Sequence, residues 1–286
     1  MRDHGTVHAQ EMKMTTTKAK GTALVTGASS GIGAIYADRL AKRGYDLILV
    51  ARNKARLATL ARRLRNETGR SVQTVEADLT SSADLRRIEE ILRSDARITT
   101  LVNNAGVGSA LPLVDADVDK MEDMIHLNVT ALARLTYAAV PGFVARGGGT
   151  LINVSSIVAI APELLNGVYG GSKAFVLALG QSLVHEFADK GLRIQTVLPG
   201  ATATEFWDIA GKPVHQLPGQ IVMSADDMVD AALAGLDLGE AVTIPSLPNQ
   251  IEWDRFDEAR RTMSGKLSSS IPAPRYNARQ SGRLSA

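Results

Sequence analysis

The stretch that decides the fold reads Thr22-Ala-Leu-Val-Thr26-Gly-Ala-Ser-Ser-Gly-Ile-Gly33. Its first five residues form a short β-type run, and an amphipathic helical stretch follows over Ile32–Arg43. Glycines at 27, 31 and 33 permit a tight turn and a close approach of the backbone to a ligand. A helix that starts after such a turn presents free N–H groups and a positive dipole end to phosphates. We therefore expect a dinucleotide pyrophosphate here, although glycines also serve ordinary turns.

The same alternation of strand and helix continues along the chain. A nearly continuous apolar run over Asp46–Ala51 is typical of a strand that is covered on both faces. Alternating strands and helices imply a parallel, doubly wound α/β sheet with right-handed crossovers. The expected strands are 22–26, 46–51, 71–76, 99–103, 150–155, 193–198 and 241–245, and the expected helices are 32–43, 54–68, 83–94, 118–146, 168–190, one from Ser224, and 247–265.

The chain is expected to form one domain between two flexible ends. Residues 1–20 are polar and predict a flexible arm, residues 21–265 predict the domain, and residues 266–286 predict a flexible tail. After Pro199-Gly200 the alternation stops, and residues 201–223 show no clean period. A segment of this length inside a compact domain is typical of a substrate lid.

Composition excludes several classes of protein and site. With 32 basic and 30 acidic residues, the balance argues against a nucleic-acid partner. The absence of cysteine excludes disulfides and thiolate chemistry. His126, His185 and His215 lack metal-ligand spacing, so no metal is expected. No signal-like or membrane-spanning apolar run occurs, so a cytoplasmic protein without a membrane partner is expected. Met12 and Met14 are alternative starts between which the sequence does not decide.

The end of the second expected strand bears on which dinucleotide is bound. An NAD site usually carries an acid about 20 residues past the glycines, where it holds the ribose 2′-hydroxyl. Here Ala51 and Arg52 stand at that position. A guanidinium can bind a 2′-phosphate in a bidentate manner, although a surface arginine is the alternative interpretation. We therefore expect NADP(H) in preference to NAD(H).

Three groups of residues converge on one chemistry. Tyr169 and Lys173 are four apart, so they share a face of the expected helix. Ser155 and Ser156 end a strand, and the run Asn103-Asn-Ala-Gly106 ends another, so both face the same crevice at the carboxyl ends of the strands. Either serine could hydrogen-bond a substrate oxygen, and tyrosine can act as an acid or base if its pKa falls from about 10. A nearby ammonium and a positive nicotinamide ring would lower that pKa.

Over about residues 20–245 the chain resembles the single-domain branch of the short-chain dehydrogenase/reductase family, which has a Rossmann fold with about seven strands. No catalytic position departs from the family pattern. The motifs that carry the resemblance are Thr26–Gly33, Asp78-Leu79, Asn103–Gly106, Asn128, Ser156, Tyr169-x-x-x-Lys173 and Pro199-Gly200-Ala-Thr-Ala-Thr204.

The resemblance implies roles for these residues. The usual serine-to-tyrosine interval of the family selects Ser156 over Ser155, with Tyr169 as acid/base. Lys173 would hold the nicotinamide ribose, and Asn128 would support a water that relays protons through Lys173. The cofactor contacts implied, some of them also expected from the residues themselves, are Gly27, Ser29, Ser30, Gly31, Ile32, Gly33, Arg52, Asp78, Leu79, Asn103, Ala105, Gly106, Tyr169, Lys173, Pro199, Gly200, Thr202 and Thr204.

The expected activity is hydride transfer between NADP(H) and a carbonyl or secondary alcohol. The physiological substrate and the direction of the reaction stay open. Two alternative functions also stay open: a nicotinamide-dependent epimerase or dehydratase, and a non-catalytic NADP(H)-binding regulator. Apolar helices over 118–146 and 168–190 resemble the pairing helices of the family, which implies a homodimer or homotetramer. Apolar residues expected to line the substrate pocket are Leu111, Val158, Pro162, Phe206, Trp207, Ile209 and Leu217.

Overall fold

The computed structural model describes residues 20–276. The described chain divides into two compact units, one that ends at Pro245 and one that begins at Ser246. The predicted arm (1–20) lies almost wholly outside the described residues, as does the last part of the predicted tail, 277–286. The second unit contains helix α9 (Gln250–Ser264), which Asn249 caps through its side chain, and a short 3₁₀ turn, Pro274–Tyr276.

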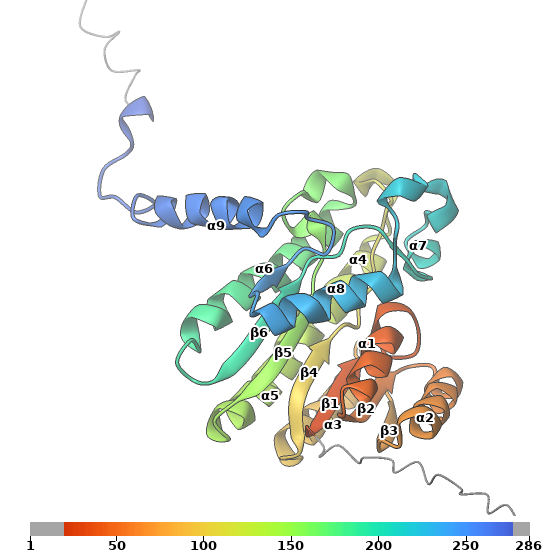
Figure 1. Cartoon of the computed structure of the whole chain (residues 1–286). Helices are drawn as coiled ribbons and strands as arrows, with labels where there is room; N and C mark the ends of the chain where they lie inside the picture. The colour runs from red at the N-terminus through yellow and green to blue at the C-terminus, as the bar shows by residue number, and fades with distance from the viewer. Residues whose placement is uncertain (1–19, 277–286) are drawn as a thin grey trace, which may run out of the picture. The chain divides into compact units, whose positions relative to one another are not determined.

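A seven-stranded parallel sheet forms the first unit (Figure 1). Its order is β3-β2-β1-β4-β5-β6-β9, so the direction of winding reverses between β1 and β4. Ligands of such sheets bind at that reversal, outside the carboxyl ends of the strands. The doubly wound fold expected from the sequence is confirmed. The strands are β1 (Thr22–Thr26), β2 (Asp46–Ala51), β3 (Val72–Glu76), β4 (Ile98–Asn103), β5 (Gly149–Val154), β6 (Leu192–Val197) and β9 (Val242–Thr243).

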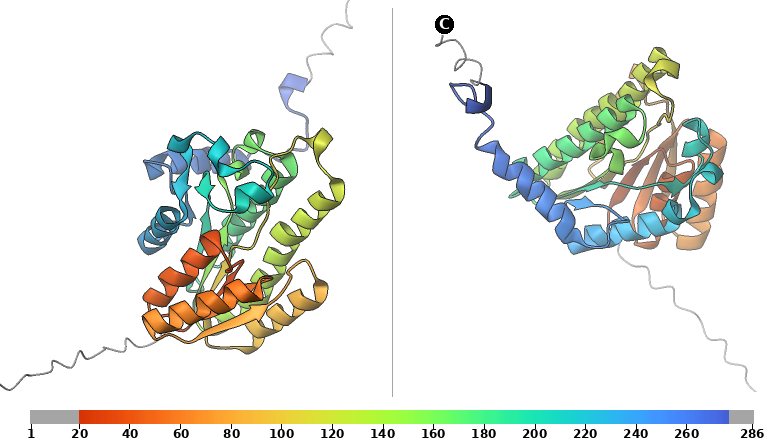
Figure 2. Two further views of the ribbon diagram at one scale, coloured as in Figure 1. Left: turned by 90° about the vertical axis from the view of Figure 1, so that its right-hand side faces the viewer. Right: turned by 90° about the horizontal axis from the view of Figure 1, so that it is seen from above.

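Helices cover both faces of the sheet because the strands are apolar on both sides. Leu47 and Leu49 of β2 belong to a core cluster with residues of α1, α2 and α8, whereas Ile48 and Val50 of the same strand belong to a second cluster with residues of α3, α5 and α6. Figure 2 shows α1 and α2 together in front of one face of the sheet. The bounds are α1 (Gly31–Lys42), α2 (Lys54–Thr68), α3 (Ser82–Ser94), α4 (Val118–Ile125), α5 (Leu132–Ala145), α6 (Gly167–Glu186) and α8 (Ala225–Leu238).

Three expected elements differ from the structure. The helix expected over 118–146 contains a π-helical turn, His126–Ala131, between α4 and α5. The helix expected over 168–190 ends at Glu186, because the chain turns back through Gly191 at a φ of 71°. The strand expected over 241–245 is reduced to two residues that pair with the end of β6.

The segment 201–223 is closed at its base by a small parallel strand pair. Strand β7 (Thr202–Ala203) pairs with β8 (Met223–Ser224), so the two ends of the segment lie side by side. Between them the chain forms one short helix, α7 (Phe206–Ile209), and two 3₁₀ turns. This irregular structure explains the absence of a clean period in the sequence. The role of a substrate lid stays a prediction.

Large apolar side chains are exposed on two long helices of the first unit. Tyr137 of α5 is 74% exposed, and Phe175 of α6 is 38% exposed. Exposed aromatic residues of this size are common at protein–protein contacts. The expected homodimer or homotetramer stays a prediction.

Candidate active site

The glycine turn between β1 and α1 is shaped for close contact with a ligand backbone. Gly27 and Gly31 have φ values of 64° and 53°, in the left-handed region that favours glycine. A Cβ atom on Gly33 would lie 2.4 Å from the carbonyl oxygen of Gly27. Asn104 holds the turn in place, because its side-chain amide donates to the carbonyl oxygens of Thr26 (2.9 Å) and Gly27 (3.3 Å).

The N-terminus of α1 suits an anionic group. Its N-cap residue, Ser30, makes no side-chain capping bond, and its first turn carries no acidic residue. The backbone N–H groups of this turn, which includes Ile32, are therefore available to phosphate oxygens. Ser29 and Ser30 are partly exposed beside them. The residues present thus fit a dinucleotide pyrophosphate.

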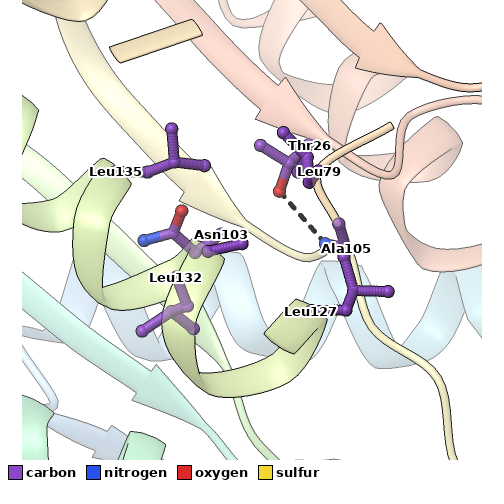
Figure 3. Close-up of a pocket in the computed structure, with 8 residues that line it drawn as sticks. Thr26, Leu79, Asn103, Ala105, Leu127, Leu132 and Leu135 are labelled. Carbon is purple, nitrogen blue, oxygen red and sulfur yellow. Dashed lines mark hydrogen bonds between the residues drawn. The ribbon is translucent and has the colours of Figure 1, made fainter. Parts of the chain in front are cut away.

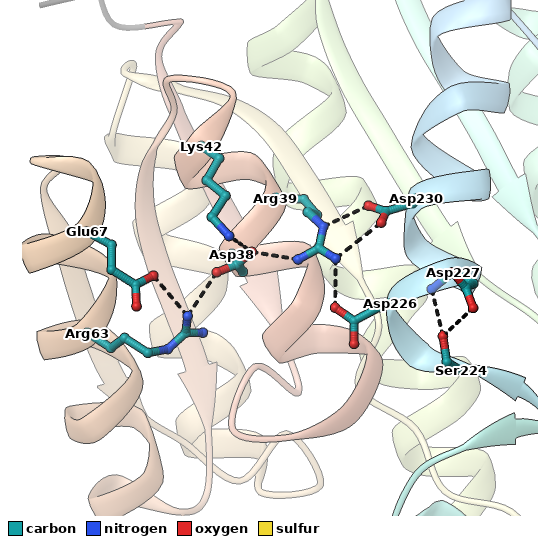
Figure 4. A network of polar contacts seen from close by, with 9 residues as sticks. All are labelled: Asp38, Arg39, Lys42, Arg63, Glu67, Ser224, Asp226, Asp227 and Asp230. Atoms are coloured by element: carbon teal, nitrogen blue, oxygen red, sulfur yellow. Dashed lines mark hydrogen bonds and ion pairs between the residues drawn. The ribbon is translucent and has the colours of Figure 1, made fainter.

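A charge network anchors α1 to its neighbours (Figure 4). The buried carboxylate of Asp38 accepts hydrogen bonds from Arg39, Lys42 and Arg63. Burial alone would raise the pKa of Asp38, but these three bonds outweigh burial and lower the pKa. Arg39 also binds Asp230 of α8, so the network joins α1, α2 and α8 and fixes the helix that carries the glycine turn.

The adenosine side of the site carries the residues expected to select the cofactor. Arg52 is exposed at the end of β2 and has no hydrogen-bond or ion-pair partner among residues 20–276. Asp78 follows β3, and its carboxylate accepts from the backbone and hydroxyl of Thr80. Burial would raise the pKa of Asp78, yet the Thr80 bonds and the charge of Arg52 lower it. Arg52 thus lies within electrostatic reach of Asp78.

A small pocket lies beside this region (Figure 3). The backbone N–H of Ala105 donates to the Thr26 hydroxyl at 3.0 Å, which fixes the β4 end to the glycine turn. Asn103 is buried there, and its side-chain oxygen lacks a partner among the described residues. The pocket is lined by Thr26, Leu79, Asn103, Ala105, Leu127, Ala131, Leu132 and Leu135, so three of the expected cofactor contacts meet in it.

The residues expected to be catalytic come together at the carboxyl end of β5. Tyr169 and Lys173 are both buried in α6, and the Lys173 ammonium lies 5.9 Å from the centre of the tyrosine ring. Ser156 hydrogen-bonds the Tyr169 side chain. Ser155 instead donates to the Lys173 carbonyl oxygen at 2.7 Å. The two serines therefore differ in what they contact, and only Ser156 meets the tyrosine hydroxyl.

The protonation of this group differs from the sequence-based expectation. Burial raises the pKa of Tyr169 to about 12, although the Ser156 hydrogen bond acts to lower it. Burial lowers the pKa of Lys173 to about 8. The ammonium donates to the carbonyl oxygen of Val154 at 2.9 Å. The expected reduction of the Tyr169 pKa is therefore wrong for the protein alone, because desolvation dominates.

Asn128 lies in the π-helical turn and is 1% exposed. Its amide donates to the Val107 carbonyl (2.8 Å) and to Ser172 (3.0 Å), and its side-chain oxygen accepts from the Val107 N–H (3.0 Å). Turns of this kind often occur at functional sites. Ser172 also donates to the Tyr169 carbonyl oxygen. No sequence pattern indicated Ser172 or Val107, because both contact Asn128 on a distant segment.

The motif after β6 lies beside Ser156 and the glycine turn. The Ser156 hydroxyl contacts the carbonyl oxygen of Pro199 at 3.4 Å, and Gly200 accepts from the Thr202 hydroxyl at 3.1 Å. A Cβ atom on Gly31 would lie 3.2 Å from a Thr204 carbon, so this motif reaches the glycine turn.

Aromatic side chains of α7 form one wall beside the tyrosine. The centres of the Phe206 and Tyr169 rings lie 5.7 Å apart. A Cβ atom on Gly108 would lie 2.3 Å from a carbon of the Phe206 ring. Trp207 is buried and donates to the Thr202 carbonyl. Of the other residues expected in the wall, Val158 is buried in the same cluster, whereas Ile209 is 66% exposed. Leu111 is 43% exposed.

Two features are absent from residues 20–276. No group of three or more His, Asp or Glu side chains there is arranged to hold a metal ion. No helix in that range combines the length and apolar character needed to cross a membrane.

Comparison with known sequences places the chain among reductases and dehydrogenases. Residues 21–212 match the family model for short chain dehydrogenases. A 17-beta-hydroxysteroid dehydrogenase type 3 of Homo sapiens is 33% identical over 220 residues, which span 76% of this chain and 68% of that protein. A very-long-chain 3-oxoacyl-CoA reductase of Anas platyrhynchos is 35% identical over 201 residues, which span 68% of this chain and 64% of that protein.

Solved structures agree with these relatives. A short-chain dehydrogenase from Sphingobium yanoikuyae in complex with NADPH is 48% identical, with a TM-score of 0.86 over 89% of this chain and 98% of that one. The bulky-bulky ketone specific alcohol dehydrogenase from Comamonas testosteroni is 42% identical, with a TM-score of 0.83 over 91% of this chain and 99% of that one. The chain therefore belongs to the short-chain dehydrogenase family and is an oxidoreductase that acts on alcohol or carbonyl groups.

Proposed function

We propose that the protein transfers a hydride between NADP(H) and a carbonyl or secondary alcohol, with Tyr169 as the acid/base. The observation that carries this proposal is the buried contact between Ser156 and Tyr169, with Lys173 on the same helix face. No specific observation favours either of the two alternatives, which are an epimerase or dehydratase that keeps its cofactor bound and a non-catalytic regulator.

The chain's own residues supply proton transfer and orientation. The bound nicotinamide supplies or accepts the hydride. Ser156 donates to the substrate oxygen and positions it, and the Tyr169 hydroxyl gives its proton to that oxygen during reduction. Lys173, with a pKa of about 8, exchanges protons near neutral pH. The side-chain amide of Asn128 already donates hydrogen bonds to Val107 and Ser172, so a relay water would have to bind the side-chain or backbone oxygen of Asn128.

The preference for NADP(H) rests on Arg52. Its guanidinium is exposed and unpaired among residues 20–276, beside the end of β2. A guanidinium in this state can bind the 2′-phosphate in a bidentate manner without breaking an existing hydrogen bond. The NADPH complex of the Sphingobium yanoikuyae enzyme supports the same cofactor. The remaining contacts of the glycine turn serve NAD(H) and NADP(H) equally.

Substitution of Arg52 by Asp should reverse the cofactor preference. Loss of a charge-assisted contact, together with repulsion of the 2′-phosphate, should lower kcat/KM for NADPH by roughly 10- to 100-fold. The value for NADH should change much less. Steady-state kinetics with both cofactors measure the ratio. Arg86→Asp is the control, because it makes the same charge change on an exposed face of α3. An unchanged ratio in Arg52→Asp would contradict the assignment.

The wall beside Tyr169 supports a ketone with bulky apolar substituents as the substrate class. Phe206, Val158 and Met121 surround the tyrosine with apolar surface. The names of two relatives point the same way: one acts on a hydroxysteroid and one on bulky-bulky ketones. A polyol or free sugar would leave its hydroxyls unpaired against such a wall.

A panel of carbonyl compounds of increasing apolar size would test the substrate class. NADPH oxidation, followed by absorbance, should be faster with ketones that carry two bulky apolar groups than with acetone or a ketose. The reason is that apolar area buried against the wall adds to transition-state binding. Turnover only with the ketose would contradict the proposed class. Turnover with no member at all would favour the non-catalytic alternative.

A cytoplasmic location stays a prediction.

A further inference from the structure

Glu205 connects three segments that are far apart in the sequence. Its carboxylate receives two hydrogen bonds from the guanidinium of Arg56 on α2, at 2.5 and 3.0 Å. It also accepts a hydrogen bond from Ser30 in the glycine turn. These bonds, of which the one to Arg56 has the largest effect, lower the pKa of Glu205 and keep it charged. The residue thus joins the start of α7 to the phosphate turn and to α2.

The chain between Thr204 and Ala210 is held by other segments at both of its ends. At the outer end, Glu205 holds Arg56 and Ser30. At the inner end, the carbonyl oxygen of Ala210 accepts from the backbone N–H of Ala110, at 2.9 Å, in the loop after β4. Between these points the Phe206 ring lies on Tyr169. This short stretch therefore runs from the phosphate turn to the catalytic tyrosine.

We propose that the Arg56–Glu205 ion pair is a strap that retains the bound dinucleotide by holding this stretch across its site. The inference rests on the proposed binding of NADP(H) at the glycine turn. Arg56 and Glu205 are positioning residues: they act on the cofactor through the segment that they fix. Both side chains are about half exposed, at 49% and 54%. Exposed ion pairs are weak, which suits a contact that must open whenever the cofactor leaves.

Arg56 has a second effect in this arrangement. The contact with Ser30 places a carboxylate beside the turn that receives the phosphates. Without its arginine partner, that carboxylate would repel them. Removal of Arg56 should therefore weaken cofactor retention at least as much as removal of the Glu205 charge. The repulsion by the unpaired carboxylate should vanish when both residues are replaced.

The rate of NADPH release from the full-length protein tests the strap. Stopped-flow displacement of NADPH by excess NADP⁺, followed by nicotinamide fluorescence, gives this rate for Glu205→Gln, Arg56→Gln and the double variant. Release from Glu205→Gln should be about two- to fivefold faster than from the wild type, the range expected for an exposed ion pair. Release from Arg56→Gln should be at least as fast, and the double variant should match Glu205→Gln. Added salt should accelerate the wild type more than Glu205→Gln.

Glu67→Gln is the matched control, because Glu67 forms an exposed ion pair with Arg63 on the same helix (Figure 4). Its release rate should equal that of the wild type. Unchanged or slower release from Glu205→Gln would overturn the strap, and slower release would mean that Glu205 competes with the cofactor for Arg56. A double variant that releases NADPH faster than Glu205→Gln would instead make Arg56 a direct phosphate ligand. Absence of NADPH binding by the wild type would contradict the proposed function itself.

Discussion

Tyr169→Phe should lower kcat for carbonyl reduction by about 10²- to 10⁴-fold, the usual contribution of a general acid. The substitution removes only the hydroxyl that would protonate the substrate oxygen. The ring stays in its buried place against Phe206, and the Ser156 hydroxyl keeps its contact with the Pro199 carbonyl. The Kd for NADPH should therefore change little, because the glycine turn is untouched.

Single-turnover kinetics with a ketone substrate and a fluorescence titration with NADPH separate these two effects. The matched control is Tyr137→Phe, which removes a tyrosine hydroxyl from an exposed site on α5, where the side chain is 74% exposed. Its kcat and its Kd for NADPH should both equal those of the wild type. A kcat for Tyr169→Phe within tenfold of the wild type would rule out Tyr169 as the proton donor.

Gly33→Ala should raise the Kd for NADPH by roughly 10- to 100-fold, the effect of an overpacked contact of one to three kcal/mol. The added Cβ would lie 2.4 Å from the Gly27 carbonyl oxygen and 2.5 Å from the Asn104 amide nitrogen. The first of these atoms is backbone, so it cannot rotate away. The turn and α1 must separate, and the N–H groups at the helix start then lose their alignment with the phosphates.

Isothermal titration of NADPH measures this loss. The control is Gly167→Ala, at the first residue of α6, where an added Cβ would meet no atom within 4 Å. That variant should bind NADPH like the wild type, and circular dichroism should show that both variants are folded. Wild-type affinity in Gly33→Ala would mean that the phosphates do not bind at this turn.

Local pattern was enough to predict most of the fold. The apolar run of β2 and the glycines that end the helices are signals within a few residues of each other. Helix α2, expected over 54–68, has these bounds in the structure. The π-helical turn around Asn128 was not predictable in this way. A π turn and an α-helix share nearly the same apolar period, and the contact that accompanies the turn joins Asn128 to Val107 on another segment.

The candidate site shows the same division. The four-residue spacing of Tyr169 and Lys173 put both on one helix face, and family resemblance selected Ser156. The protonation of Tyr169 needed the folded structure, because burial raises its pKa to about 12 and no local pattern reports burial. The pairing of Arg56 with Glu205 likewise follows from no local pattern and is seen only in the structure.

The sequence by itself determined the doubly wound sheet, the glycine turn and the order of the motifs, because these depend on period and on residues that are close along the chain. Only the tertiary structure decided how buried the tyrosine and lysine are, and what Glu205 contacts. Those properties depend on atoms brought together from distant parts of the chain, as with Arg56 and Glu205, which are 149 residues apart. Their physical origin is desolvation and side-chain geometry, which exist only once the chain has folded.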